Sequence, residues 1–116
     1  MSDVLNPVDV ERHISGVRDR IAKGVRVVTD AEREAKRLRR EFDLAFARAY
    51  KAAEGSIPDK KYQAQIDTIE LREEAENAEI AFNYAERTAW ALKDELSALQ
   101  SIGASVRAMY ETAGRS

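Results

Sequence analysis

Apolar residues recur every seven positions along the first half of the chain, in two interleaved series. The first series contains Ile14, Ile21, Val28, Ala35, Phe42 and Ala49, and the second contains Val10, Val17, Gly24, Ala31, Leu38, Ala45 and Ala52. Gly24 is the single member of the two series that is not apolar. A stripe of this period predicts a long helix that needs a partner helix to cover it.

The expected limits of this helix come from residues that favour helix ends. Asn6 can cap the first turn and Pro7 suits the first helical position. Thr29 and the glutamate three residues later would permit a break, but the series keeps its phase there, so we expect one helix over residues 7–54. Gly55 suits a C-terminal cap, and the proline that follows prevents continuation, which predicts a turn over 55–58.

The second half of the chain repeats the pattern. Its series are Leu71, Ala78, Ala85, Leu92 and Leu99, and Ala75, Phe82, Ala89 and Leu96. Ser56 and Asp59 can cap this second helix, which we expect over 59–101 and antiparallel to the first because the connection is short. Gly103 indicates a break before a short helix over 104–112, so residues 1–116 are expected to form a single helical domain.

The expected fold is therefore all-α: a long antiparallel, coiled-coil-like helical hairpin with a short C-terminal helix. A second group of apolar residues lies off the hairpin stripe, and such a surface favours an oligomer. The expected oligomer interface consists of Ile66, Ile69, Ile80, Tyr84 and Trp90 from this group and of Ile102, Val106 and Met109, which form one apolar face of the short helix. The alternative is that the short helix folds back and covers part of this group as ordinary core.

The residues needed for most catalytic and metal sites are missing from the sequence. Cysteine is absent and His13 is the only histidine, which leaves no material for thiolate or paired-histidine metal sites or for a Ser-His-Asp triad. The acidic residues at 70–79 are interpreted as a solvated helix face. We expect a protein that is not an enzyme and needs no metal or cofactor. Without an apolar run of about 20 residues or a signal-peptide pattern, we expect it in the cytoplasm.

Charge is distributed unevenly along the chain. Residues 12–40 contain ten Lys or Arg and four acids, whereas residues 59–100 contain five Lys or Arg and ten acids. In the first region Arg33, Lys36, Arg37 and Arg40 lie away from the apolar stripe and could contact phosphates.

These cations have two other interpretations. They can pair with glutamates of their own helix. They can also pair with the acids at 72–79, which should lie opposite them across the hairpin, and Arg39 is the best placed for that role.

A second group of cations surrounds the expected turn. It consists of Arg48, Lys51, Lys60 and Lys61, with Tyr50 and Tyr62 nearby. Aromatic rings beside cations suit single-stranded nucleic acid, whose unpaired bases stack on rings while its phosphates meet positive charge. Phe42 and Phe46 also lie here, and we expect them to serve mainly in packing.

The order of elements resembles a known family. A basic helix leads to "ARAYKAAEGSIPDKKY", a long helix carries "NYAERTAWALKDELSAL", and a Ser-x-Gly step precedes the basic segment "SIGASVRAMYE". Over residues 30–114 this arrangement resembles the UvsY-like family of phage recombination mediator proteins. Arg48 matches the basic segment of that family, whereas Phe46 stands where a second cation is expected.

The resemblance implies a function as well as a fold. It implies a homo-oligomer that binds single-stranded DNA without sequence specificity and helps to load a RecA-type recombinase where single-strand-binding protein is present. It also implies that the C-terminal segment takes part in assembly and that the protein acts in the cytoplasm of a bacterium or of a phage-infected host. The alternative is a structural or protein-interaction coiled-coil protein, such as a virion assembly factor or an inhibitor of a host protein.

Overall fold

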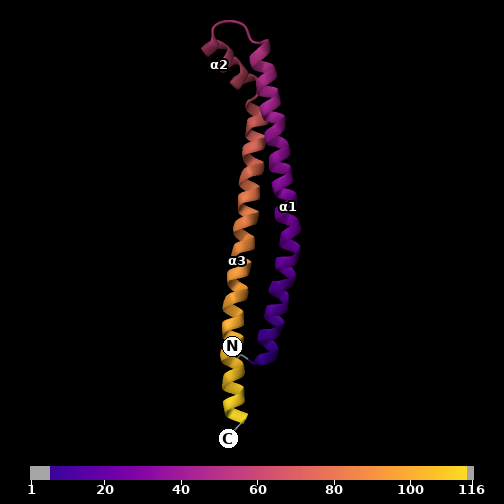
Figure 1. Cartoon of the computed structure of the whole chain (residues 1–116), viewed down its shortest axis with the longest axis vertical. Coiled ribbons are helices and arrows are strands. Elements are labelled where there is room, and N and C mark those ends of the chain that lie inside the picture. The colour runs from indigo at the N-terminus through magenta and orange to yellow at the C-terminus, as the bar shows by residue number, and fades with distance from the viewer. Residues whose placement is uncertain (1–5, 115–116) are drawn as a thin grey trace. The chain divides into compact units, whose positions relative to one another are not determined.

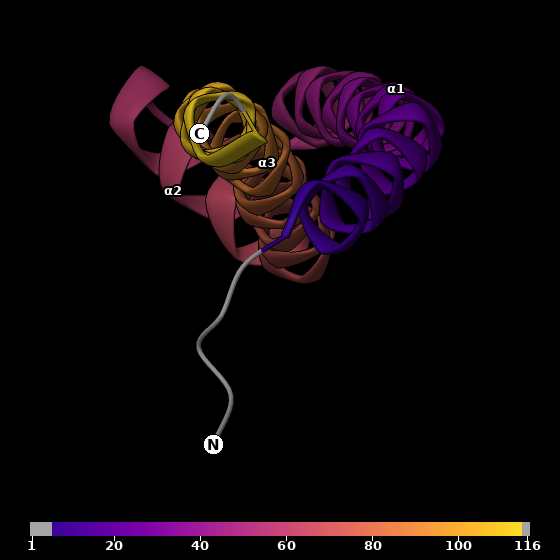
Figure 2. The same cartoon turned by 90° about the horizontal axis from the view of Figure 1, so that it is seen from below.

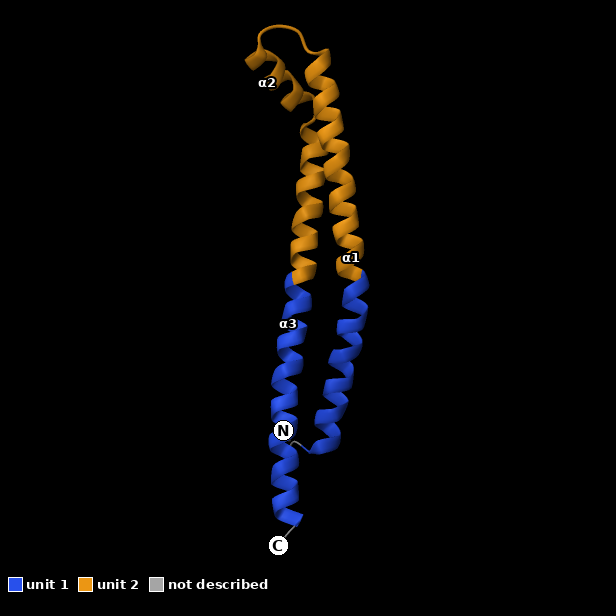
Figure 3. Cartoon of the chain, in the orientation of Figure 1, with its two compact units in different colours: residues 1–26, 87–116 blue, residues 27–86 orange. Residues whose placement is uncertain are grey.

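The computed structural model describes residues 6–114, and every regular element in that range is a helix (Figure 1). The helices are α1 (Pro7–Ala52), α2 (Ile57–Asp67) and α3 (Ile69–Gly114). Contacts divide the chain into two compact units, shown in Figure 3. Unit 1 comprises Met1–Arg26 with Arg87–Ser116, and unit 2 comprises Val27–Glu86.

In each unit a segment of α1 lies beside a segment of α3 that runs in the opposite direction (Figures 1 and 2). The predicted all-α antiparallel hairpin is thus confirmed. The two seven-residue series of α1 are buried or half-buried at every position except Ala52, and those of α3 are buried or half-buried throughout. The stripe therefore faces the partner helix, as its period predicted.

Asn6 caps α1. Its side-chain oxygen accepts a hydrogen bond from the backbone N–H of Asp9 at 2.9 Å, and its amide nitrogen donates to the Asp9 carboxylate at 2.8 Å. This reciprocal cap satisfies a backbone donor that the first helical turn leaves unpaired. From there α1 runs without interruption past Thr29, as expected, and it ends at Ala52 rather than at residue 54.

The turn after α1 covers residues 53–56, slightly earlier than the predicted 55–58. Gly55 adopts a φ of 107°, a left-handed conformation that glycine reaches without strain. The Ser56 side chain accepts a hydrogen bond from the backbone N–H of Asp59 at 3.3 Å and caps α2. The predicted cap residues are therefore correct, although the helix begins at Ile57.

The predicted helix over 59–101 was wrong in one respect, because it is divided at Thr68 into α2 and α3. Figure 1 shows α2 set at an angle to α3. Thr68 has a φ of −117° and a ψ of 12°, and its hydroxyl donates to the carbonyl oxygen of Ala64 at 2.7 Å. A threonine that bonds to the carbonyl one turn back competes with the helical backbone and often bends a helix.

The predicted break near Gly103 and the separate helix over 104–112 were also wrong, since α3 continues to Gly114. Gly103 follows Leu96 by seven residues and therefore lies on the seam, the apolar stripe along which α1 and α3 face each other. It is buried there. A Cβ atom on Gly103 would lie 3.2 Å from Val10 Cγ1. This glycine therefore permits a close approach of α3 to α1 and does not end the helix.

The core of unit 1 gathers around this approach. Val10, Ile14 and Val106 form a buried cluster, against which Leu96 and Leu99 pack. Two ion pairs cross between the helices on its surface, Arg20 with Glu95 at 3.4 Å and Arg107 with Glu11 at 3.2 Å. Apolar contact and charge thus fix the same pairing of α1 with α3 in this unit.

Candidate functional site

Most cations of the 33–40 region pair with acids on α1 itself. The pairs are Arg33 with Asp30 at 3.4 Å, Lys36 with Glu32 at 3.8 Å, Arg37 with Glu34 and with Glu41, and Arg39 with Asp43 at 3.5 Å. All of these partners lie three or four residues away, which is the spacing at which helical side chains meet. The interpretation as local helix pairs is therefore confirmed.

The alternative, in which these cations pair across the hairpin with the acids at 72–79, is wrong. No ion pair within 4 Å joins the cations at 33–40 to the acids at 72–79, all of which are described residues. The Arg39 guanidinium pairs instead with Asp43 of α1, and its central carbon lies 5.6 Å from the centroid of the Phe42 ring. On the opposite helix Glu76 pairs with Arg72 at 3.6 Å.

Arg37 is held more firmly than its neighbours because it contacts two carboxylates. It donates to Glu34 from Nε at 3.0 Å and to Glu41 from Nη1 at 2.7 Å. The hydrogen bond from Arg37 lowers the pKa of Glu34 below its ordinary value, and the two carboxylates raise the pKa of Arg37. Of the predicted DNA-binding cations, Arg37 is the least available to an external phosphate.

Five of the predicted cations have no acidic partner within 4 Å among the described residues. They are Arg40, Arg48, Lys51, Lys60 and Lys61. Lys51 lies in the last turn of α1, and Lys60 and Lys61 lie in the first turns of α2, on the two sides of the connection seen in Figure 1. All except the half-buried Lys60 are exposed. Four of these five cations, Arg48, Lys51, Lys60 and Lys61, thus lie near the turn of unit 2.

An aromatic row accompanies these cations on α1. The ring centroids of Phe42 and Phe46 are 6.1 Å apart, and those of Phe46 and Tyr50 are 6.5 Å apart. All three rings are half-buried. Tyr62, on α2, is exposed over 62% of its surface. The two tyrosines thus offer aromatic surface near the turn.

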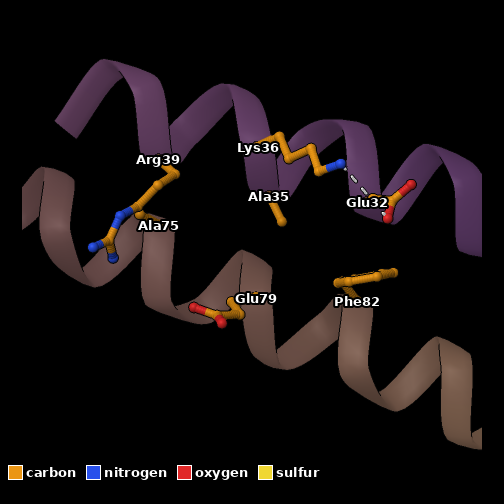
Figure 4. Close-up of a pocket in the computed structure, with 7 residues that line it drawn as sticks. All are labelled: Glu32, Ala35, Lys36, Arg39, Ala75, Glu79 and Phe82. Carbon is orange, nitrogen blue, oxygen red and sulfur yellow. Dashed lines mark ion pairs between the residues drawn. The ribbon is translucent and has the colours of Figure 1, made fainter. Parts of the chain in front are cut away.

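A hollow of about 360 Å³ interrupts the seam between α1 and α3 in unit 2 (Figure 4). We call it the seam hollow, and its lining residues are Glu32, Ala35, Lys36, Arg39, Ala75, Glu79 and Phe82. Figure 4 shows Ala35 and Phe82 facing this space and Arg39 reaching from α1 toward α3. Two alanines at seam positions leave the space between the helices underfilled. The sequence signal for this gap is the small size of Ala35 and Ala75 within the seven-residue series.

A second hollow, of about 350 Å³, lies where α2 meets α3. We call it the elbow hollow, and its lining residues are Tyr62, Gln65, Ile66, Ile69 and Arg72. It includes two of the predicted interface residues, and Ile66 is 67% exposed. Sequence reasoning could not locate this hollow because it depends on the bend at Thr68.

The other predicted interface residues are distributed over both units. Ile80 and Tyr84 are exposed on α3 in unit 2, and Trp90, Ile102 and Met109 are exposed on α3 in unit 1. Val106 is different, because it is buried in the core cluster of unit 1. Its apolar surface is therefore already covered within the chain.

Residues 6–114 contain no group of three or more His, Cys, Asp or Glu side chains placed to hold a metal ion. None of the helices in this range combines the length and the apolar character needed to span a membrane. Comparison of the chain with protein-family models, with curated proteins and with solved structures found no match.

Proposed function

We propose that the protein binds single-stranded DNA without sequence specificity, through the cations around the turn of unit 2. The observation that carries this proposal is the group of five cations that have no acidic partner within 4 Å in the described part of the chain, placed on α1 and α2 on both sides of the connection. Phosphates require positive charge that is free to approach them, and they require no particular sequence. Arg48, Lys51, Lys60 and Lys61 meet this requirement best.

The aromatic residues near the turn favour a single strand over a duplex. Tyr50 and Tyr62 can stack with unpaired bases, whose faces are accessible only outside a double helix. Such stacking does not depend on the identity of the base, which agrees with binding that is not sequence-specific.

Arg33, Lys36 and Arg40 extend the same basic surface along α1. Arg40 has no acidic partner within 4 Å among residues 6–114. The pairs of Arg33 and Lys36 are exposed, so a phosphate can compete with their carboxylates at little cost. Arg37 contributes least because two carboxylates already engage it.

The biological role that we propose is that of a phage-type recombination mediator. In this role a homo-oligomer presents many copies of a weak DNA site, so that multivalency raises the total affinity. It would organise single-stranded DNA for a RecA-type recombinase in the presence of single-strand-binding protein, in the cytoplasm. The resemblance of residues 30–114 to such mediators and the exposed apolar residues of α3 support this role.

The test is the affinity for a fluorescein-labelled oligo(dT), measured by anisotropy at several salt concentrations. Arg48→Ala with Lys51→Ala should weaken binding and lower the slope of log K against log salt by about 1.4, from about 0.7 per phosphate contact. Arg12→Ala with Arg18→Ala removes the same charge from unit 1 and should change neither the affinity nor the slope. Equal effects of the two double variants, or no binding at low salt, would contradict the proposal.

A structural or protein-interaction coiled-coil protein remains the second candidate. The observation that favours it is the exposure of Ile80 and Tyr84 on α3, since large apolar side chains in water mark protein contacts more often than nucleic-acid contacts. Failure to retain oligo(dT) at low salt, together with self-association of the purified protein, would favour this candidate.

A further inference from the structure

The elbow hollow has apolar walls and a few polar groups. Its walls are the ring of Tyr62 and the side chains of Ile66 and Ile69, which are 62%, 67% and 46% exposed. Gln65 and Arg72 complete the lining. Its volume of about 350 Å³ lies within the range of small-molecule sites, roughly 300–1,000 Å³. This combination suits an aromatic ligand that is apolar on its faces and polar on its rim.

The two polar residues of the hollow can both contact such a ligand. The Gln65 side-chain amide has no hydrogen-bond partner among the described residues, and it carries both a donor and an acceptor. Arg72 pairs with Glu76 at 3.6 Å, but both side chains of that pair are 52% exposed, so the guanidinium is exchanged at little cost. A guanidinium plane can also stack on an aromatic ligand.

The elbow hollow continues into the basic surface of α2. Lys61 precedes Gln65 by four residues, so the two side chains share a helix face. Lys60 and Lys61 have no acidic partner within 4 Å in the described part of the chain. A ligand that carries phosphate groups can therefore place them on α2 beside the hollow.

We propose that the elbow hollow holds one base of a single DNA strand, an inference that rests on the proposed function. The base stacks on the Tyr62 ring and contacts Ile66 and Ile69. Gln65 bonds to the polar edge of the base, and the adjoining phosphates lie on the side of Lys61. The strand is thus bound through a base as well as through its phosphates.

The charges around the hollow decide which part of the strand enters it. The acids Glu70 and Glu73 lie on α3 outside the lining of the hollow, and carboxylates repel phosphate. A base is neutral, so these acids do not exclude it. The phosphates are drawn instead toward the lysines of α2, on the side of the turn.

A purely apolar occupant uses less of the hollow. A leucine or isoleucine side chain from another protein would pack on Ile66 and Ile69 but would leave the Gln65 amide without a partner. Under the present proposal these two isoleucines contact DNA, and self-association rests on the other exposed apolar residues of the expected interface. Each copy in an oligomer then holds one base, which agrees with multivalent binding.

Competition between two oligomers tests the contact with the base. Short oligo(dT) and an abasic oligomer with the same number of phosphates each displace fluorescein-labelled oligo(dT) from the full chain at low salt. Oligo(dT) should bind at least about 5-fold more tightly, because stacking on an aromatic ring strengthens binding by about that factor or more. Equal affinities would overturn the inference and leave binding through phosphates standing.

The ratio of these two affinities locates the contact when it is measured in variants. Tyr62→Ala should lower the ratio by at least about 5-fold, whereas Tyr84→Ala, which removes an exposed tyrosine of α3, should leave it unchanged. Ile66→Ser should also lower the ratio, with Ile80→Ser as the matched control. Equal effects of a variant and its control would refute the assignment to the elbow hollow.

Two further results separate the base contact from phosphate binding. Tyr62→Ala should leave the slope of log K against log salt unchanged, because no phosphate contact is lost. Gln65→Ala should lower the affinity ratio, and Gln63→Ala, which alters a glutamine of the same helix outside the lining, should not. A reduced slope in Tyr62→Ala would show that the variant disturbs the phosphate contacts and would contradict the inference.

Photochemical crosslinking closes the test. Oligo(dT) that carries one 5-iodouracil is irradiated in complex with the wild-type protein, and peptide mapping by mass spectrometry should find the base attached to Tyr62. Attachment elsewhere with none at Tyr62 would overturn the inference. So would an Ile66→Ser variant that loses self-association but keeps the affinity ratio, because the hollow would then receive a second copy. If neither oligomer binds at low salt, the proposed function fails as well.

Discussion

The two units are built from the same pair of long helices, yet they differ in what lies between those helices. In unit 1 Val10, Ile14 and Val106 fill the seam, and Gly103 brings the backbones close together. In unit 2 the alanines at positions 35 and 75 leave the seam hollow of about 360 Å³. A sustained seven-residue repeat therefore determines which side faces the partner helix, but the size of its members determines how well the seam is filled.

The two units also differ in how their charged side chains pair. Unit 1 uses two ion pairs that join α1 to α3. Among the described residues, the 33–40 cations of unit 2 pair along α1 or, like Arg40, have no acidic partner within 4 Å. Ion pairs thus join the two helices in unit 1. Exposed apolar residues occur in both units, whereas the seam hollow and the elbow hollow both lie in unit 2.

The largest expected effect on stability comes from replacing Gly103 by a larger residue. Because its Cβ would already lie 3.2 Å from Val10 Cγ1, Gly103→Leu should overpack the seam and lower the free energy of unfolding by about 1–3 kcal/mol. Urea denaturation followed by circular dichroism measures this change. Gly24→Ala is the control in the same unit, because nothing lies within 4 Å of its Cβ, and it should stabilise by about 1 kcal/mol. Destabilisation by both variants would show that unit 1 is not packed as described.

Filling the seam hollow should have a smaller and opposite effect. Ala35→Leu places added methylene groups in the hollow of unit 2 and should raise the free energy of unfolding by about 1–2 kcal/mol. Ala64→Leu provides the contrast, since Ala64 is fully buried and a larger side chain there should destabilise. A loss of stability in Ala35→Leu would mean that the hollow does not accept a side chain from the seam.

Removing the Thr68 hydroxyl should cost about 1 kcal/mol, because Thr68→Val leaves the buried carbonyl oxygen of Ala64 without this hydrogen bond. Thr112→Val removes the same type of bond to Ala108, at 2.9 Å, from an exposed site where water replaces it. Chemical denaturation should therefore distinguish the two variants. Equal stabilities would argue against a structural role for the bond at the bend.

The smallest effect concerns Glu34, whose pKa is lowered by the hydrogen bond from Arg37. A carboxyl with a lowered pKa in the folded state stabilises above its unfolded pKa, and this contribution is lost as the pH falls through the folded pKa. Glu34→Gln should therefore lower the melting temperature slightly at neutral pH and not at strongly acidic pH. A difference that persists unchanged at acidic pH would exclude the ion pair as its cause.

Sequence alone was sufficient for the all-helical class, for the faces that the helices bury and for the caps at Asn6, Gly55 and Ser56, because these signals act locally. It failed at Gly103 and at Thr68 for reasons that are not local. Glycine ends helices often, but Gly103 is accommodated because Val10 of the partner helix needs the space. Thr68 lies in an ordinary helical sequence, and its bend becomes apparent only where its hydroxyl bonds to Ala64.

The sequence predicted which cations belong to the candidate site, but not which of them already pair with an acid. The positions of the cations follow from sequence, yet which of them remain unpaired depends on side-chain geometry. Arg37 engages two carboxylates, whereas Arg40, three residues further on, has no acidic partner within 4 Å among the described residues. The elbow hollow forms because the chain bends at Thr68, and the seven-residue pattern does not predict that bend.

The central claim is that unit 1 holds the fold while the turn end of unit 2 binds DNA. Amide hydrogen exchange read by mass spectrometry, with and without saturating oligo(dT), tests both parts in one measurement. We predict the slowest exchange in residues 10–17 and 96–106, and slowing by DNA confined to residues 40–72. The slowest exchange in unit 2, or slowing by DNA centred on unit 1, would contradict the account.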